Sequence, residues 1–265
     1  MKYRLITLIL AIAIFSCAAQ NRGRGVFKAD IYLYGILTRT DTLTLYDSVQ
    51  KRAIPITINN RQEGSHFDDQ LRRNARRKLV ILNPGYGSAR SDYSYIASHL
   101  ATNDYLVVTI QHDLPADDSL PRTGDIYKLR KPFWERGVKS ILFTIAWLKK
   151  EYPKVDYKRI ILMGHSNGGD IAMYMATEYP DFAKIVITLD NRRVPIPRTR
   201  HPKILSIRSA DQPADPGVLP TAEEQKKYRI NIVGTGIKHN NMGGNATEDQ
   251  KKEIKGYLND FLGLD

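Results

Sequence analysis

Cysteine is almost absent from this sequence of 265 residues: Cys17 is the only one, and it lies near the N-terminus. A chain with one cysteine forms no internal disulfide. It also lacks the thiolate sets on which many structural zinc sites depend. If the segment around Cys17 is removed from the mature protein, a cysteine nucleophile is excluded as well. Nucleophilic chemistry would then depend on another residue type.

Long apolar runs are also scarce. The first of them lies directly before the segment that contains Cys17. Residues 5–15 are predominantly apolar, follow two basic residues and precede Ser-Cys-Ala-Ala at 16–19. The run is too short to span a membrane permanently, and its flanks are typical of a secretory signal peptide. The cysteine at its end resembles a bacterial lipoprotein cleavage site. We therefore predict a signal peptide over residues 1–19 with lipidation at Cys17; cleavage near Ala19 without a lipid is the alternative.

This leader predicts an exported protein of the bacterial cell envelope, either tethered to a membrane by its lipid or secreted. Residues 20–265 suffice for one α/β domain with a sizeable core. A hydrophobic fraction of 42% suits such a domain. The sequence contains no internal repeat or linker that would indicate a second domain, and it does not indicate an oligomeric state.

Acidic residues are outnumbered, with 28 Asp and Glu against 40 Lys and Arg, which gives a formal charge of +12. Such a surface attracts anionic partners such as lipid headgroups, cell-wall polymers or acidic substrates. Nucleic acid is not expected as a partner, because the basic cluster at residues 72–78 has no interleaved aromatic residues on which bases would stack. A solvated surface explains that cluster.

From residue 79 onward, apolar runs alternate with amphipathic stretches. The runs lie at 79–82, 105–110, 160–163, 185–189, 204–207 and 230–233, and the expected helices at 92–101, 133–151, 168–178, 221–228 and 248–262. This alternation predicts an α/β fold with a mostly parallel, doubly wound sheet. Segments 29–37, 42–47 and 53–59 precede it and predict N-terminal antiparallel strands, at the sheet edge or in hairpins.

The run at 160–163 leads directly into Gly-His-Ser-Asn-Gly at residues 164–168. This matches the G-x-S-x-G turn, in which a serine lies between a strand and a helix. The turn is so tight that side chains two residues before and after the serine would collide, which requires Gly164 and Gly168. The motif therefore marks Ser166 as a candidate nucleophile.

With this motif in place, residues 79–265 resemble the α/β-hydrolase superfamily. Pro-Gly-Tyr-Gly at 84–87 and Gln-His-Asp at 111–113 add a narrower similarity to dienelactone-hydrolase-like and acetylhydrolase-like esterases. True dienelactone hydrolases have a cysteine where this chain has Ser166. The resemblance implies the α/β-hydrolase fold and a chain order of nucleophile, acid and histidine.

Two histidines follow the nucleophile, His201 and His239. A serine hydroxyl needs a neighbouring base to take its proton. The resemblance places that base just after the last predicted strand, where His239 lies. His201 precedes a strand and belongs to the opposite end of the sheet.

The base in turn needs a carboxylate to hold its tautomer. Asp211 follows the run at 204–207, where the resemblance places the acid of most superfamily members, and is the first choice. Asp190, after the preceding strand, and Asp215 remain alternatives, although both also fit a role in capping a loop.

Backbone N–H groups are expected to stabilise the oxyanion formed in acyl transfer. The resemblance points to the N–H groups of Asn167, after the nucleophile, and of Tyr86, in the loop after the first core strand. Gly85 and Gly87 would let that loop approach a substrate closely, although a plain tight turn is the competing interpretation.

A short segment separates the strands at 185–189 and 204–207, where superfamily members commonly insert a cap. It therefore predicts a minimal cap. Arg192, Arg193 and Arg198 lie in this segment. They are candidates for recognising an anionic group, with solvated surface as the alternative.

These observations predict an exported serine hydrolase that cleaves a carboxylic ester, through an acyl-enzyme on Ser166, with no metal or organic cofactor. Its substrate would be a small molecule or an acyl group attached to a polymer. A peptidase or amidase with the same triad is one alternative. A catalytically inactive surface binding protein that kept the fold is another.

Overall fold

The computed structural model describes residues 28–31, 37–61 and 76–264. The predicted signal peptide, Cys17 and the first part of the basic cluster at 72–78 lie outside these residues. No helix in the described ranges is both long and apolar enough to cross a membrane.

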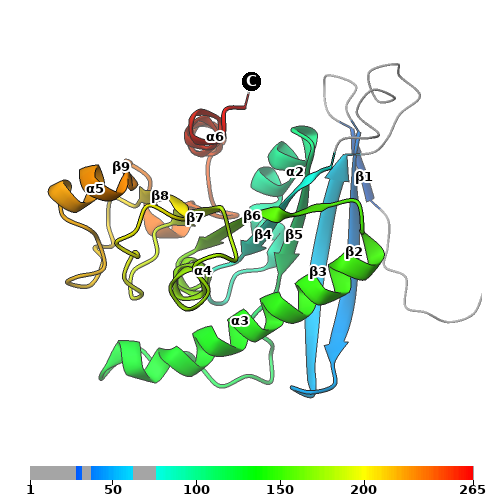
Figure 1. The fold of residues 1–265 in the computed structure, drawn as a ribbon, viewed down its shortest axis with the longest axis horizontal. Helices are drawn as coiled ribbons and strands as arrows, with labels where there is room; N and C mark the ends of the chain where they lie inside the picture. Colours follow the sequence, from blue (N-terminus) through cyan, green and yellow to red (C-terminus); the bar gives the residue numbers. More distant parts are fainter. Residues whose placement is uncertain (1–27, 32–36, 62–75, 265) are drawn as a thin grey trace, which may run out of the picture.

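The strands of the described residues form one sheet (Figure 1), in the order β1-β2-β3-β5-β4-β6-β7-β8-β9. In chain order they are β1 (Lys28–Ile31), β2 (Leu37–Asp47), β3 (Arg52–Arg61), β4 (Lys78–Asn83), β5 (Tyr105–Ile110), β6 (Asp156–His165), β7 (Ile185–Leu189), β8 (Lys203–Arg208) and β9 (Asn231–Gly234). From β5 to β9 every neighbouring pair is parallel, whereas β1, β2 and β3 pair antiparallel with one another and β3 pairs antiparallel with β5. The predicted α/β class, mostly parallel with N-terminal antiparallel strands, is confirmed.

The N-terminal strands differ from the prediction in one respect. β2 and β3 form the expected hairpin, but β3 lies inside the sheet, between β2 and β5. Pro55 is tolerated there because the pairing of β3 with β5 begins one residue later, at Ile56. The missing N–H of Pro55 would point to the same side as its carbonyl, which accepts a hydrogen bond from Gln111 N just beyond β5.

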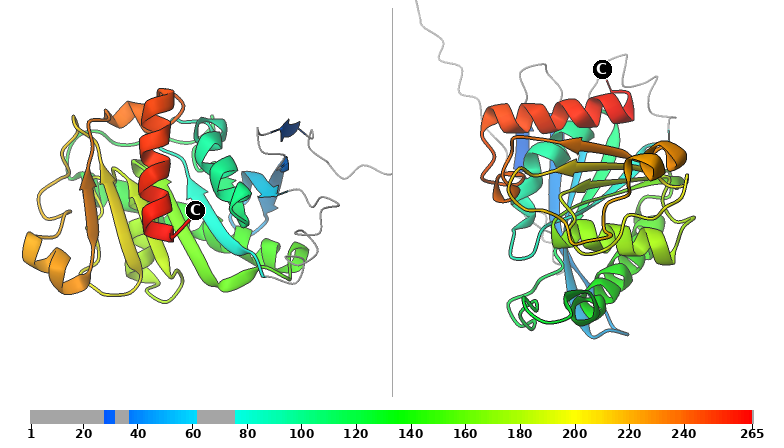
Figure 2. Two further views of the ribbon diagram at one scale, coloured as in Figure 1. Left: turned by 90° about the horizontal axis from the view of Figure 1, so that it is seen from above. Right: turned by 90° about the vertical axis from the view of Figure 1, so that its left-hand side faces the viewer.

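Helices cover both faces of the sheet (Figure 2). The helices α3 (Ile126–Glu151) and α4 (Asn167–Glu178) pack on one face, and α2 (Ser94–Thr102) and α6 (Glu248–Leu262) on the other. Successive residues of β4 point to opposite faces, so that Leu79 and Ile81 join the first apolar cluster while Val80 and Leu82 join the second. The short helix α5 (Ala222–Tyr228) connects β8 to β9.

The predicted start of the helix at 133–151 is wrong. α3 begins at Ile126, because the carboxylate of Asp125 accepts a hydrogen bond from Lys128 N and caps the first turn. Pro132 therefore lies within the helix. The other predicted helices are confirmed within a few residues of their ends. The segment between β7 and β8 contains neither helix nor strand, which confirms the minimal cap.

The turn from β6 into α4 is the tightest feature of the fold. Ser166 lies between the two elements with φ of 51° and ψ of −120°, a conformation that costs a non-glycine residue on the order of 1–3 kcal/mol. A Cβ atom on Gly164 would overlap the carbonyl of Gly168. A Cβ atom on Gly168 would overlap the carbonyls of Asn83 and Pro84, just after β4. The predicted need for glycine at both positions is confirmed.

Gly168→Ala is expected to lower the free energy of unfolding by about 3 kcal/mol, because the new methyl group meets backbone atoms that cannot move independently. Gly256→Ala is the matched control. Gly256 lies exposed in α6 with no atom within 4 Å of the added Cβ, and alanine there should raise stability by about 1 kcal/mol. Urea unfolding followed by tryptophan fluorescence measures both changes. Equal midpoints for Gly168→Ala and the wild type would contradict the close approach of the two backbones.

Candidate active site

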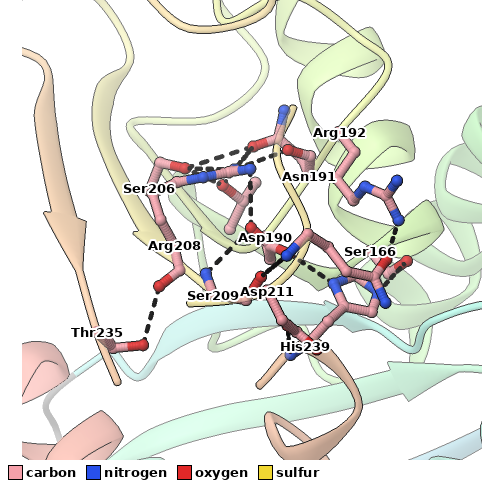
Figure 3. A network of polar contacts seen from close by, with 12 residues as sticks. Ser166, Asp190, Asn191, Arg192, Ser206, Arg208, Ser209, Asp211, Thr235 and His239 are labelled. Atoms are coloured by element: carbon pink, nitrogen blue, oxygen red, sulfur yellow. Dashed lines mark hydrogen bonds and ion pairs between the residues drawn. The ribbon is translucent and has the colours of Figure 1, made fainter. Parts of the chain in front are cut away.

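Ser166 and His239 lie in hydrogen-bond contact (Figure 3). The Nε2 atom of His239 is 2.9 Å from Ser166 Oγ. His239 opens the short 3-10 helix His239–Asn241, which follows β9. The two residues that the sequence singled out, 73 positions apart, are thus brought together at the carboxyl end of the parallel strands.

Asp190 is the carboxylate that faces the imidazole. Its Oδ2 atom lies 2.6 Å from His239 Nδ1. Asp190 directly follows β7 and has a φ of 56°, a left-handed conformation that Asp tolerates better than most residues. The first-choice prediction of Asp211 for this contact is wrong, and the alternative Asp190 occupies the place.

Asp211 instead holds the backbone of the same histidine. Its Oδ1 atom accepts a hydrogen bond of 2.7 Å from His239 N. The third candidate, Asp215, pairs with Arg193. His201 lies exposed just before β8, away from Ser166, as its place in the sequence predicted.

The Asp190 carboxylate is fully buried and receives four hydrogen-bond donors or cations. Besides His239 these are Ser209 N at 3.1 Å, Ser209 Oγ at 2.7 Å and the Arg208 guanidinium at 2.8 Å. Burial by itself would raise the pKa of Asp190. The hydrogen bonds from His239 and Ser209 and the charge of Arg208 outweigh it, so the pKa is lowered and the carboxylate is ionised at neutral pH.

His165, next to the nucleophile, links the two loops of the site. Burial lowers the pKa of His165 to about 3, so its ring is neutral. Its Nε2 atom lies 3.1 Å from the carbonyl oxygen of His239 and must donate to it, because a carbonyl only accepts. Nδ1 therefore accepts from Tyr93 Oη at 2.7 Å, and that hydroxyl accepts from Gly85 N. The sequence did not predict these hydrogen bonds, because its only signal for them was a histidine adjoining the serine.

Neither the backbone N–H of Tyr86 nor that of Asn167 donates a hydrogen bond to another described residue. On either side of Tyr86, Gly85 N donates to Tyr93 Oη and Gly87 N to Asp113. Asn167 is the first residue of α4, where N–H groups have no acceptor within the helix. Because Gly168 packs against the carbonyls that precede Gly85, the two free N–H groups belong to neighbouring backbone segments.

Metal-binding side chains do not gather within residues 28–31, 37–61 and 76–264: no group of three or more His, Asp or Glu residues there could hold an ion.

Comparison with known proteins identifies the fold. No protein-family model matches the chain, and no curated protein matches it in sequence. A dienelactone-hydrolase-like promiscuous phosphotriesterase from metagenomic libraries superposes with a TM-score of 0.61 at 15% identity, covering 86% of this chain and 98% of that one. S-formylglutathione hydrolase from Agrobacterium tumefaciens gives a TM-score of 0.57 at 13% identity, with 90% and 97% covered. Esterase 2 from Thermogutta terrifontis gives 0.57 at 12%, with 84% and 95% covered.

At sequence identities this low, a superposition establishes the fold only. The activity has to be argued from the residues of the site. The strand order, the turn at Ser166 and these superpositions agree with the resemblance seen in the sequence. The chain therefore has the α/β-hydrolase fold.

Proposed function

We propose that the protein is a serine hydrolase that cleaves a carboxylic ester through an acyl-enzyme intermediate. The observation that carries the proposal is the position of the His239 ring, hydrogen-bonded to Ser166 Oγ through one nitrogen and to the Asp190 carboxylate through the other. This arrangement of hydroxyl, imidazole and carboxylate is what activates a serine in hydrolases of unrelated folds.

In the first step Ser166 Oγ attacks the ester carbonyl while His239 Nε2 takes the hydroxyl proton. The buried charge of Asp190 stabilises the imidazolium that forms, and keeps Nδ1 protonated throughout. The oxygen of the tetrahedral intermediate carries the negative charge, and we infer that the N–H groups of Tyr86 and Asn167 donate to it. His239 then gives its proton to the leaving alcohol, and an ester on Ser166 remains.

In the second step a water molecule attacks this ester while His239 Nε2 takes its proton. The same N–H groups stabilise the second tetrahedral intermediate. When that intermediate collapses, His239 returns the proton to Ser166 Oγ and the carboxylic acid leaves. Every proton that moves passes through one nitrogen of one ring, so the reaction depends on the tautomer that Asp190 fixes.

Labelling by a fluorophosphonate probe tests the nucleophile. We expect the wild type to be labelled on Ser166 and Ser166→Ala to remain unlabelled, because the probe reacts with serines activated by a base. Peptide mass analysis identifies the modified residue, and circular dichroism checks that both proteins are folded. A folded wild type that resists labelling would favour the alternative of a surface binding protein that kept the fold without the chemistry.

The identity of the acid is tested by a matched pair of variants. Asp190→Asn should lower kcat by about 10³–10⁴-fold. A neutral amide does not stabilise the His239 imidazolium and does not hold the Nδ1–H tautomer. Asp211→Asn keeps an oxygen that still accepts from His239 N, so a loss below about tenfold is expected. Ester hydrolysis by both variants gives the comparison. A larger loss for Asp211→Asn than for Asp190→Asn would restore Asp211 as the acid.

We further propose that the protein is exported and anchored to a membrane of the cell envelope by a lipid on Cys17. The support is the leader pattern of residues 1–19, with its basic start, apolar run and cysteine. Mass spectrometry of the mature N-terminus should find an acylated Cys17, and Cys17→Ala should move the protein from the membrane fraction to the soluble one. A mature chain that begins after Ala19 without a lipid would contradict the anchor.

A further inference from the structure

The arginines around the loop that follows β7 differ in whether a carboxylate neutralises them. Arg193 pairs with Asp215, Arg198 with Glu224, and Arg208 with Asp190. Arg192 contacts only the neutral side-chain oxygen of Gln212 through Nη1. Its Nε atom is buried and has no hydrogen-bond partner. Arg192 is therefore a cation without a counter-ion among the described residues.

The backbone of this loop is fixed to the nucleophile helix. A single oxygen of Asp170 accepts from the backbone N–H groups of Arg192, Arg193 and Val194, at 3.1, 2.9 and 3.0 Å. Asp170 lies one turn beyond Ser166, and its own N–H donates to the Ser166 carbonyl. Arg192 thus starts from a backbone position held against the first turn of α4.

The side chain of Arg192 extends over the loops that hold the base. Its partner Gln212 adjoins Asp211, whose carboxylate binds His239 N, whereas Arg192 itself is two residues from Asp190. The guanidinium therefore bridges the two loops that fix His239. In Figure 3 it points toward the Ser166 and His239 pair.

A second cation adds to the positive charge. Arg130, from α3, donates to the carbonyl of Pro121 and has no carboxylate partner among the described residues. Burial is the main cause that lowers the pKa of Arg130, and the charges of Arg193 and Arg192 lower it further, whereas Asp170 and Asp215 raise it. Arg130 thus adds to the positive charge that Arg192 experiences, and an anion bound to Arg192 would be stabilised by both.

We propose that Arg192 binds an anionic group of the substrate, a carboxylate next to the scissile ester. The inference rests on the proposed hydrolysis. Because Nη1 is directed to Gln212 and Nε is buried, Nη2 is the guanidinium nitrogen that remains to donate a charge-assisted hydrogen bond to a carboxylate oxygen. The preferred substrates are therefore half-esters or esters of hydroxy acids, in which a free carboxylate accompanies the bond that is cut.

Substrate pairs that differ in charge test the inference. For the leaving group, para-acetoxybenzoate is compared with the neutral para-acetoxybenzamide; for the acyl group, the ethyl monoester of succinic acid is compared with ethyl butyrate. Arg192→Gln should lower kcat/KM by about tenfold to a hundredfold on the anionic member of a pair, and by less than about twofold on its neutral member. The pair that responds identifies which side of the ester carries the carboxylate.

Arg193→Gln is the matched control, since it removes the same charge from the next residue of the same loop. Because Arg193 is already paired with Asp215, we expect kcat/KM on both members of each pair to stay within about twofold of the wild type. Arg192→Lys keeps the charge but not the planar guanidinium that can contact Gln212 and a substrate anion together, and should recover only part of the loss.

Equal losses on anionic and neutral substrates in Arg192→Gln would overturn the inference, because the guanidinium would then only position Gln212 and its loop. Failure of the proposed hydrolysis looks different, since the wild type would cleave none of these esters. Calorimetric titration of Ser166→Ala then decides. Tighter binding of para-acetoxybenzoate than of the benzamide, abolished by adding Arg192→Gln, supports the inference, whereas equal or undetectable binding of the two overturns it.

Discussion

The hydrogen bonds to the Asp190 carboxylate are the interaction on which the rest of the site depends. A buried charge without partners costs several kcal/mol, and this one is compensated by His239, Ser209 and Arg208 together. Arg208 ends β8, Ser209 follows it and His239 follows β9, while Asp190 itself follows β7. One carboxylate thus connects the ends of three strands. The hydrogen bond that compensates its charge also orients the His239 ring toward Ser166.

The choice of Asp190 has a consequence for the loop after β8. Since the acid comes from the preceding strand, Asp211 is free to bind the backbone of His239, and Gln212 is free to hold Arg192. The histidine is then held by its ring from one loop and by its main chain from another. His165 adds a third contact, because it donates to the carbonyl of His239. The same ring accepts from Tyr93, whose hydroxyl accepts from Gly85 N in the loop of Tyr86. The proposed base and oxyanion donors are therefore parts of one hydrogen-bonded frame.

Much of this could be predicted from the sequence, because the responsible signals are local. Apolar runs of strand length fix the parallel sheet, and the glycines around Ser166 fix the turn that exposes it. The acid could not be predicted in this way. Asp190 and Asp211 both follow parallel strands and reach the same edge of the sheet, so the decision depends on side-chain direction. The direction of the Asp190 carboxylate is set by hydrogen bonds from Ser209 and Arg208, which lie at the end of the neighbouring strand β8. The start of α3 was missed because a capping bond at Asp125 extends the helix ahead of Pro132.

The partners of the nearby carboxylates also explain why Arg192 has no counter-ion in the part of the chain that the structure describes. Of the acidic groups near the nucleophile helix, Asp190 is committed to His239 and Arg208, and Asp215 to Arg193. Asp170 accepts three backbone N–H groups through one oxygen and forms no ion pair with the Arg192 guanidinium. Arg192 thus has no carboxylate partner among the described residues, because the nearby carboxylates already bind other groups. A fold that uses its anions to position the base leaves a positive charge at the place where a substrate anion can act as the missing partner.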